Sequence, residues 1–261
     1  MESSSTRRSA LMGLSIAAAG LATKGAAASA QAAAGGEGLI PAGATDLDSL
    51  ISRLAGAPRR RDFRSVPMVL EDPVLWDHEA IEELLAYKGG PTQIWDNTEI
   101  AGPWLNGMRN TLNAQIFSFR HPNFLIVSAT HGQAQLALLD QEMWEKYQLS
   151  RQAGGVPSNT FFRHDREAQA DRALQSQTGA YSAANDSIAD LMDRGVIFLA
   201  CHMWLWDFAG TLIRTGTNPD RLSHGSLVAE MTNHLAPGVV LTPGMAATIL
   251  EFQQAGYHYI K

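Results

Sequence analysis

Three runs of consecutive apolar residues constrain the fold of this chain more than any other feature. Residues 124–127, 196–200 and 239–241 are apolar at both alternating positions, and each run precedes a segment whose apolar residues have helical spacing. Strands of a parallel sheet have this pattern because helices bury both of their faces. Strands that alternate with helices form βαβ units. The pattern predicts an α/β fold with three layers, in which a mostly parallel sheet is flanked by helices.

Other segments of the chain fit the same alternation. Short strands are predicted at 93–95 and 257–260, and helices at 103–117, 132–147, 183–194, 203–214 and 244–255. Thr242-Pro243 has the residue types of an N-cap and first helical position. Residues 150–180 break the alternation and predict an inserted loop or arm, and residues 215–237 predict a second irregular stretch.

The part of the chain before residue 93 lacks this alternation. Residues 35–45 are typical of a linker, and short helices are expected at 46–56 and 77–88. The basic run formed by residues 59–61 and Arg64 is interpreted as a solvated loop. We therefore divide the chain into residues 1–34, a linker and N-terminal helical extension at 35–92, and an α/β domain at 93–261 with an insertion at about 150–180.

The first 34 residues have the order of features found in an export signal. Arg7-Arg8 precedes a weakly apolar run at 11–22, and Ala28-Ser29-Ala30 offers a cleavage site of small residues. This order predicts a signal peptide of the twin-arginine type and a periplasmic or otherwise exported protein. The alternative is an Ala-rich tail in which the two arginines are accidental. The apolar run is shorter than the roughly 20 residues of a membrane-spanning helix.

Composition excludes several classes of function. The net charge is −6, and removal of residues 1–34 takes away three basic residues and one acidic residue, which gives −8. An acidic chain is a poor partner for nucleic acid, and we expect no membrane association after removal of the signal. The single cysteine excludes an intramolecular disulfide and a cysteine-cluster metal site.

Cofactor and metal motifs are absent from the sequence. No dinucleotide-binding, phosphate-loop, zinc-protease or serine-hydrolase motif occurs, so no cofactor is expected. Four histidines could join Cys201 in a copper or zinc site, but they have no ligand spacing signature, and no metal site is assigned. These histidines are His131, His202, His224 and His234.

Cys201 is the strongest candidate for chemistry. It follows the strand at 196–200 and precedes a helix, while His131-Gly132 follows the strand at 124–127. Ligands of parallel sheets bind at the carboxyl ends of strands, where both residues would lie if the strands are neighbours. Amides at a helix start favour a thiolate, which predicts a lowered pKa for this thiol. The alternative is a buried thiol that acts as a small apolar side chain.

The residues at these positions resemble the DsrE/DsrF-like sulfur-relay family. The similarity extends from near Gln93 to Lys261, and its residues keep a family-like order and spacing. They are Leu112-Asn113-Ala114, His131-Gly132-Gln133-Ala134, Ile188-Ala189-Asp190-Leu191, Cys201, Leu241-Thr242-Pro243-Gly244-Met245-Ala246 and residues 251–261. The resemblance implies a compact, flavodoxin-like α/β sandwich that associates into homotrimers or hexamers.

The resemblance also implies a function for Cys201. In sulfur-relay members, a cysteine at this position accepts sulfane sulfur as a persulfide and passes it on, so donor and acceptor proteins are expected. His131 would orient or deprotonate the thiol, and Asn113, Gly132 and His202 are candidate binding residues. The protein would then be a sulfur carrier of the sulfurtransferase type rather than a metabolic enzyme.

A second function remains open. The run that follows Cys201, His202-Met203-Trp204-Leu205-Trp206, is bulky and apolar. Bulky neighbours favour a cysteine in the core of a non-enzymatic oligomeric module that binds a ligand or a metal.

Overall fold

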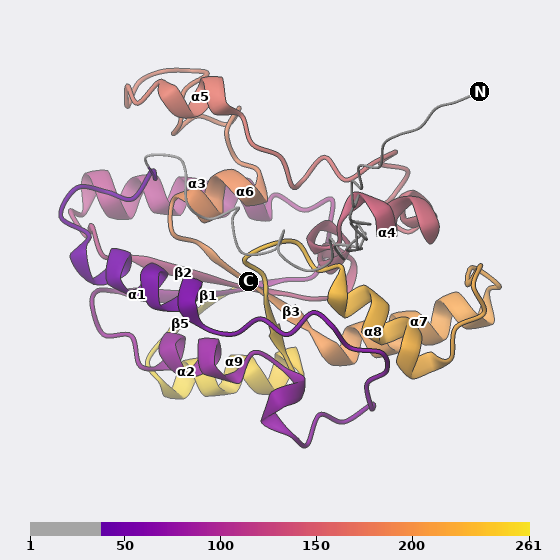
Figure 1. The fold of residues 1–261 in the computed structure, drawn as a ribbon. Coiled ribbons are helices and arrows are strands. Elements are labelled where there is room, and N and C mark those ends of the chain that lie inside the picture. Colours follow the sequence, from indigo (N-terminus) through magenta and orange to yellow (C-terminus); the bar gives the residue numbers. More distant parts are fainter. Residues whose placement is uncertain (1–37) are drawn as a thin grey trace, which may run out of the picture.

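A single sheet of parallel strands forms the middle of the protein, for which a computed structural model describes residues 38–261 (Figure 1). The strand order is β4-β3-β2-β1-β5, and every neighbouring pair is parallel. The strands are β1 (Thr92–Asn97), β2 (Leu125–Thr130), β3 (Ile197–Cys201), β4 (Val240–Thr242) and β5 (His258–Ile260). The predicted three-layer α/β fold is confirmed. The three runs that are apolar in both alternating positions form β2, β3 and β4, whose residues are buried on both faces of the sheet.

Two apolar clusters, one on each face of the sheet, make up the core. In β2, Leu125 and Val127 point into one cluster and Ile126 into the other. In β3, Leu199 likewise points into the smaller cluster and Phe198 into the larger one. Successive side chains of a strand point to opposite faces, so each apolar strand needs two helical layers to cover it.

The larger cluster lies under the helices that connect β1 to β4. These elements are α3 (Trp104–Asn113), η2 (Ala114–Ser118), η3 (Gly132–Leu138), α4 (Gln141–Lys146), η4 (Leu149–Arg151), α5 (Arg166–Ala170), α6 (Ile188–Asp193), α7 (His202–Arg214) and α8 (His224–Asn233). Side chains of α3, α6, α7 and α8 fill the cluster, whereas α5 lies on the outside of this layer (Figure 1).

The smaller cluster is covered by the N-terminal helices together with the last one. These elements are α1 (Thr45–Gly56), η1 (Pro73–Leu75), α2 (His78–Leu85) and α9 (Met245–Gln254). In α1, Leu47, Leu50 and Leu54 form the buried stripe that the sequence spacing predicts. The residues interpreted as an N-terminal extension therefore supply much of one layer of the α/β fold (Figure 1).

Three predictions about local structure were wrong. The helix expected over 132–147 is divided into η3 and α4, because the Asp140 side chain accepts the Met143 N–H and begins a new helix. The stretch at 215–237 contains α8, which Ser223 caps. Thr242 is not an N-cap: it belongs to β4, its hydroxyl donates to Ala200 O, and Gly244 precedes α9.

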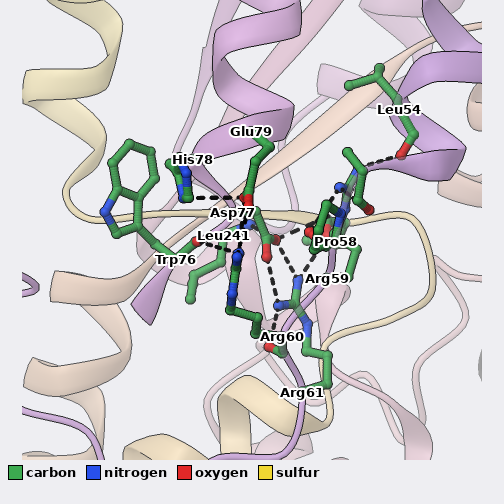
Figure 2. A network of polar contacts seen from close by, with 12 residues as sticks. Leu54, Pro58, Arg59, Arg60, Arg61, Trp76, Asp77, His78, Glu79 and Leu241 are labelled. Carbon is green, nitrogen blue, oxygen red and sulfur yellow. Dashed lines mark hydrogen bonds and ion pairs between the residues drawn. The ribbon is translucent and has the colours of Figure 1, made fainter. Parts of the chain in front are cut away.

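The basic run was also interpreted wrongly, because three of its four arginines, at residues 59–61, form ion pairs instead of facing only solvent (Figure 2). Arg60 donates two hydrogen bonds to Glu79, at 2.9 and 2.7 Å. Arg61 binds the fully buried Asp77 carboxylate at 3.2 and 2.8 Å, and the Leu241 N–H donates to the same carboxylate at 2.7 Å. This network joins the N-terminal segment to β4.

The predicted signal segment, residues 1–34, lies outside the described residues. Within residues 38–261, no helix combines the length and the hydropathy needed to cross a bilayer.

Candidate functional site

The chain leaves two neighbouring strands toward opposite faces of the sheet. After β3 it enters α7, on the side of the larger cluster, and after β4 it enters α9, on the side of the smaller one. Cys201 and Thr242, the last residues of these strands, are partners in the parallel register. In open α/β sheets, ligands bind at the carboxyl ends of strands where the connections diverge in this way.

The sulfur of Cys201 lies at the start of both helices. Cys201 is the N-cap of α7, and its Sγ accepts the Trp204 N–H at 3.4 Å. The same Sγ accepts the Met245 N–H of α9 at 3.3 Å. Free N–H groups and the helix dipole both favour negative charge at a helix N-terminus. Two helices therefore stabilise any negative charge that develops on this sulfur.

Burial opposes this stabilisation. Cys201 is 5% exposed and belongs to the smaller cluster, against which Met203 and Trp204 also pack. Burial raises the pKa of the Cys201 thiol, and the hydrogen bonds from the helix amides reduce this increase without reversing it. The expectation of a lowered pKa was wrong because desolvation of the thiolate outweighs the amide contacts. The thiol is therefore protonated near neutral pH.

A buried glutamine holds the backbone of Cys201 in place. Gln135 is fully buried in η3; its Oε1 accepts the Cys201 N–H at 2.8 Å and its Nε2 donates to Cys201 O at 3.1 Å. Because both polar groups of the amide are used on one residue, Gln135 fixes the end of β3 relative to the segment after β2.

His131 belongs to a different set of contacts. Its Nε2 lies 2.7 Å from Asp96 Oδ1, and the Tyr259 hydroxyl donates to Asp96 Oδ2 at 2.6 Å. Partial burial tends to raise the pKa of Asp96, but the hydrogen bonds from Tyr259 and His131 hold it below its ordinary value. The hydrogen bond with the Asp96 carboxylate raises the pKa of Tyr259 to about 12. Among residues 38–261, no hydrogen bond joins His131 to Cys201.

The three candidate binding residues do not converge on Cys201. Asn113 donates to Tyr181 O and accepts from Arg194, beneath the insertion. Gly132 has φ +58°, and a Cβ there would lie 2.7 Å from Thr98 O, so glycine is required by the backbone. His202 is next to Cys201 in sequence, but its Nε2 contacts Pro67 O at 2.9 Å and its ring is 1% exposed.

Sequence reasoning missed the residues that surround the two predicted catalytic groups. Asp96, Gln135 and Tyr259 come from different elements, and no spacing connects them to Cys201 or His131. The one available signal was the position of Met245 at the start of the helix that follows a buried strand, because the first N–H groups of a helix have no partner within the helix.

Two groups of side chains in the described part of the chain have atoms close enough to hold a metal ion. They are Asp140, Glu142 and His234, and His164, Asp190 and Asp193, with ligand atoms within 4.8 Å of one another. Neither group includes Cys201 or His131. The Asp190 carboxylate accepts hydrogen bonds from Ser187 and Gln169, so its lone pairs already have protein partners.

Comparisons of the chain with protein-family models, with curated proteins and with solved structures find no match. The proposal below therefore rests on the geometry at the ends of β3 and β4.

Proposed function

We propose that this protein binds sulfane sulfur at Cys201 and passes it to an acceptor. The observation that carries the proposal is the convergence of Trp204 N–H and Met245 N–H, from two helices, on the Cys201 Sγ. Anionic sulfur at this point would receive two amide hydrogen bonds and the favourable ends of two helix dipoles. The sulfur also lies where neighbouring strands send their connections to opposite faces, which is where ligands of such sheets bind.

The proposed transfer needs no external oxidant or reductant. The Cys201 Sγ attacks the terminal sulfur of a donor persulfide, R–S–S⁻, and forms a new S–S bond. The S–S bond of the donor breaks, and the donor leaves as a thiol that carries the proton of Cys201. Cys201 is then a persulfide, Cys–S–S⁻, whose anionic end is stabilised by the helix amides. Transfer to an acceptor thiol reverses these steps: the acceptor sulfur bonds to the outer sulfur, the S–S bond to Cys201 breaks, and the proton of the acceptor thiol returns to Cys201.

Access to the sulfur requires movement of the side chains that cover it. Met203 and Trp204 are partly exposed and pack against the cluster that contains Cys201. Met203 has an unbranched, adaptable side chain, so its displacement would uncover the sulfur without a change in the sheet. We infer that donor binding at this surface and exposure of the thiol occur together.

The resemblance to sulfur-relay proteins extends the proposal to the biological setting. We propose a homotrimer or hexamer, export by the twin-arginine route, and donor and acceptor proteins that recognise the surface at the ends of β3 and β4. In this proposal the helix amides, rather than His131, stabilise the negative charge that develops on the sulfur during transfer, since the Nε2 of His131 is already bonded to Asp96.

Intact mass tests the proposal directly, because Cys201 is the only cysteine. The full chain is incubated with glutathione persulfide, freed of excess donor and weighed before and after addition of a reducing thiol. Wild type should gain one sulfur atom, which the reductant removes, and Cys201→Ser should gain none. Equal uptake by Cys201→Ser, or no uptake by wild type, would contradict the proposal.

The second candidate function is a non-enzymatic oligomeric module, and the burial of the thiol favours it. In this function Cys201, which is 5% exposed and has a raised pKa, acts as an N-cap and as part of the core. Iodoacetamide distinguishes the two functions. Labelling that persulfide donors accelerate in the native protein supports relay, whereas labelling only after denaturation supports the module.

A further inference from the structure

Two arginines in the layer of α3 and α6 are buried without an acidic partner in the part of the chain that the structure describes. Arg194, directly after α6, is 1% exposed, and Arg109 of α3 is 8% exposed. The ion pairs within residues 38–261 all involve other residues, so neither guanidinium has a carboxylate oxygen of this part of the chain within 4.0 Å. Buried charges in folded proteins are almost always paired.

The hydrogen bonds of both arginines are incomplete. Arg194 Nη2 donates to Asn113 Oδ1 at 2.7 Å, whereas its Nε and Nη1 are buried and find no acceptor in the described residues. Arg109 Nη1 donates to Tyr181 O at 3.0 Å and Nη2 to Asn106 Oδ1, whereas its Nε is also buried without an acceptor. Every partner these guanidinium groups do have is a neutral oxygen.

The electrostatics point to a missing negative charge. Burial lowers the pKa of Arg194 to about 10, and the positive charge of Arg109 acts in the same direction. Burial raises the pKa of the half-buried Asp186, and the positive charge of Arg109 partly opposes that increase. Asp186 nevertheless forms no ion pair with Arg109. Two neighbouring cations thus share a buried region in which no carboxylate of the described residues lies within ion-pair distance of either guanidinium.

A residue of the insertion covers this region. The Tyr181 ring lies over Arg194, with 5.1 Å from the guanidinium carbon to the ring centroid. Tyr181 O accepts hydrogen bonds from both Arg109 and Asn113. A single loop residue therefore occupies the position where a stronger acceptor would contact all three side chains.

A cavity lies beside Asn106, a hydrogen-bond partner of Arg109. Its volume is about 220 Å³, and Asn106, Arg163 and Asp186 are among its lining residues. Asn106 Oδ1 accepts the hydrogen bond from Arg109 Nη2, so the cavity reaches a residue that contacts this buried guanidinium.

We propose that Arg109, Arg194 and Asn113 bind a small oxyanion beneath Tyr181. The arginine groups are donors only, so the ligand must supply acceptor oxygens and negative charge, as a phosphate, sulfate, thiosulfate or carboxylate does. The ligand takes up the unused N–H groups of both arginines and supplies the missing negative charge. This site is independent of sulfur transfer at Cys201, because it includes neither Cys201 nor its hydrogen-bond partners.

Thermal unfolding of the wild-type full chain is the first test. The midpoint is measured against increasing phosphate, sulfate, thiosulfate or acetate, with ionic strength held constant by chloride. A ligand that binds only the folded state raises the midpoint in a saturable way. We expect a saturable increase with at least one oxyanion, and the order among the four identifies its class. Midpoints that follow the chloride control for all four would overturn the proposal.

Variants locate the site. Arg194→Met keeps most of the side-chain volume and removes the charge, and should weaken oxyanion binding at least tenfold, whereas the exposed Arg151→Met should not change it. Asn113→Asp places a carboxylate oxygen in the position of Oδ1, 2.7 Å from Arg194 Nη2, and should remove the response to added anion because the protein then supplies the negative charge itself. Asn113→Asp tests the proposal even if Arg194→Met fails to fold. An anion response in Asn113→Asp equal to that of wild type would show that the anion binds elsewhere.

Discussion

The Sγ of Cys201 accepts the backbone N–H of Met245 at 3.3 Å, across 44 positions of sequence. Together with the Trp204 N–H, this contact makes one sulfur atom the cap of two helices that cover opposite faces of the sheet. The thiol thus has a structural role whether or not it carries sulfur, and the two roles have separate experimental consequences.

Loss of the sulfur should destabilise the protein through the two helix starts. In Cys201→Ala, the Trp204 and Met245 amides lose their acceptor, and we expect unfolding free energy to fall by about 1–3 kcal/mol. Cys201→Ser keeps an acceptor at nearly the same position and should lose less. Urea unfolding of the two variants and wild type checks this, and equal losses in both variants would argue against a capping role.

The stability of the folded protein should depend on pH through the same thiol. Folding raises the pKa of Cys201 above its unfolded value of about 8.5, so the folded state holds this proton more tightly. The stability that the protonated thiol contributes is fully present below that pH and is lost as pH rises toward the pKa of the folded state. In urea unfolding, the free energy of unfolding of wild type should therefore fall relative to that of Cys201→Ser from about pH 8 upward. A difference that is constant with pH would contradict the raised pKa.

His131 should have little effect on sulfur loading. A general base for the thiol would contribute a factor on the order of a hundred or more to the rate. Because the Nε2 of His131 is bonded to Asp96, we expect His131→Gln to load sulfur from glutathione persulfide within about threefold of wild type. Time-resolved intact mass measures this rate, and a hundredfold loss would instead assign His131 the role of base.

Gly132 should tolerate no side chain. Both Gly132 and Gly154 have positive φ values, of +58° and +68°, but only at Gly132 would a Cβ collide with backbone, at Thr98 O. Gly154→Ala should lose about 1 kcal/mol from backbone strain alone. Gly132→Ala should lose clearly more, which chemical denaturation can measure. Similar losses in the two variants would mean that the backbone near Thr98 gives way.

The buried Asp77 should contribute much more stability than Glu79, the half-buried acidic residue of the same network. Asp77→Ala leaves Arg61 and the Leu241 N–H without their acceptor, and should cost about 3–5 kcal/mol. Glu79→Ala breaks the pair with Arg60, which is open to solvent, and should cost about 0–1 kcal/mol. Denaturation by urea compares the two, and a loss at Glu79 as large as that at Asp77 would contradict this view.

The same pair with Arg60 makes a small contribution that depends on pH. Its hydrogen bond holds the pKa of Glu79 at about 2, below the unfolded value. The stabilisation is therefore present above about pH 4.3 and is lost as pH falls toward the folded value.

Local patterns predicted the layers of the fold correctly. The apolar run at 124–127 lies beneath helices on both faces, and the stripe Leu47, Leu50 and Leu54 packs as its spacing indicates. Predictions failed where a single polar side chain decided the outcome, as when Asp140 began a new helix within the expected helix at 132–147.

The burial, the hydrogen-bond partners and the pKa of the candidate residues could not be predicted from the sequence. The position of Cys201 at the end of a strand and the start of a helix followed from sequence, but its second amide donor, its burial and its raised pKa depend on α9 and the smaller cluster. The contact between His131 and Asp96 and the unpaired Arg194 likewise join elements distant along the chain.

The amino-acid sequence alone determined that this protein is a three-layer α/β fold, because hydrophobic periodicity is a local property that each strand and helix carries by itself. The tertiary structure alone decided that Cys201 caps two helices while its thiol stays protonated, and that Arg194 is buried without a carboxylate partner among residues 38–261. Solvation and charge pairing depend on every group within a few ångströms, and those groups come from segments that only folding brings together.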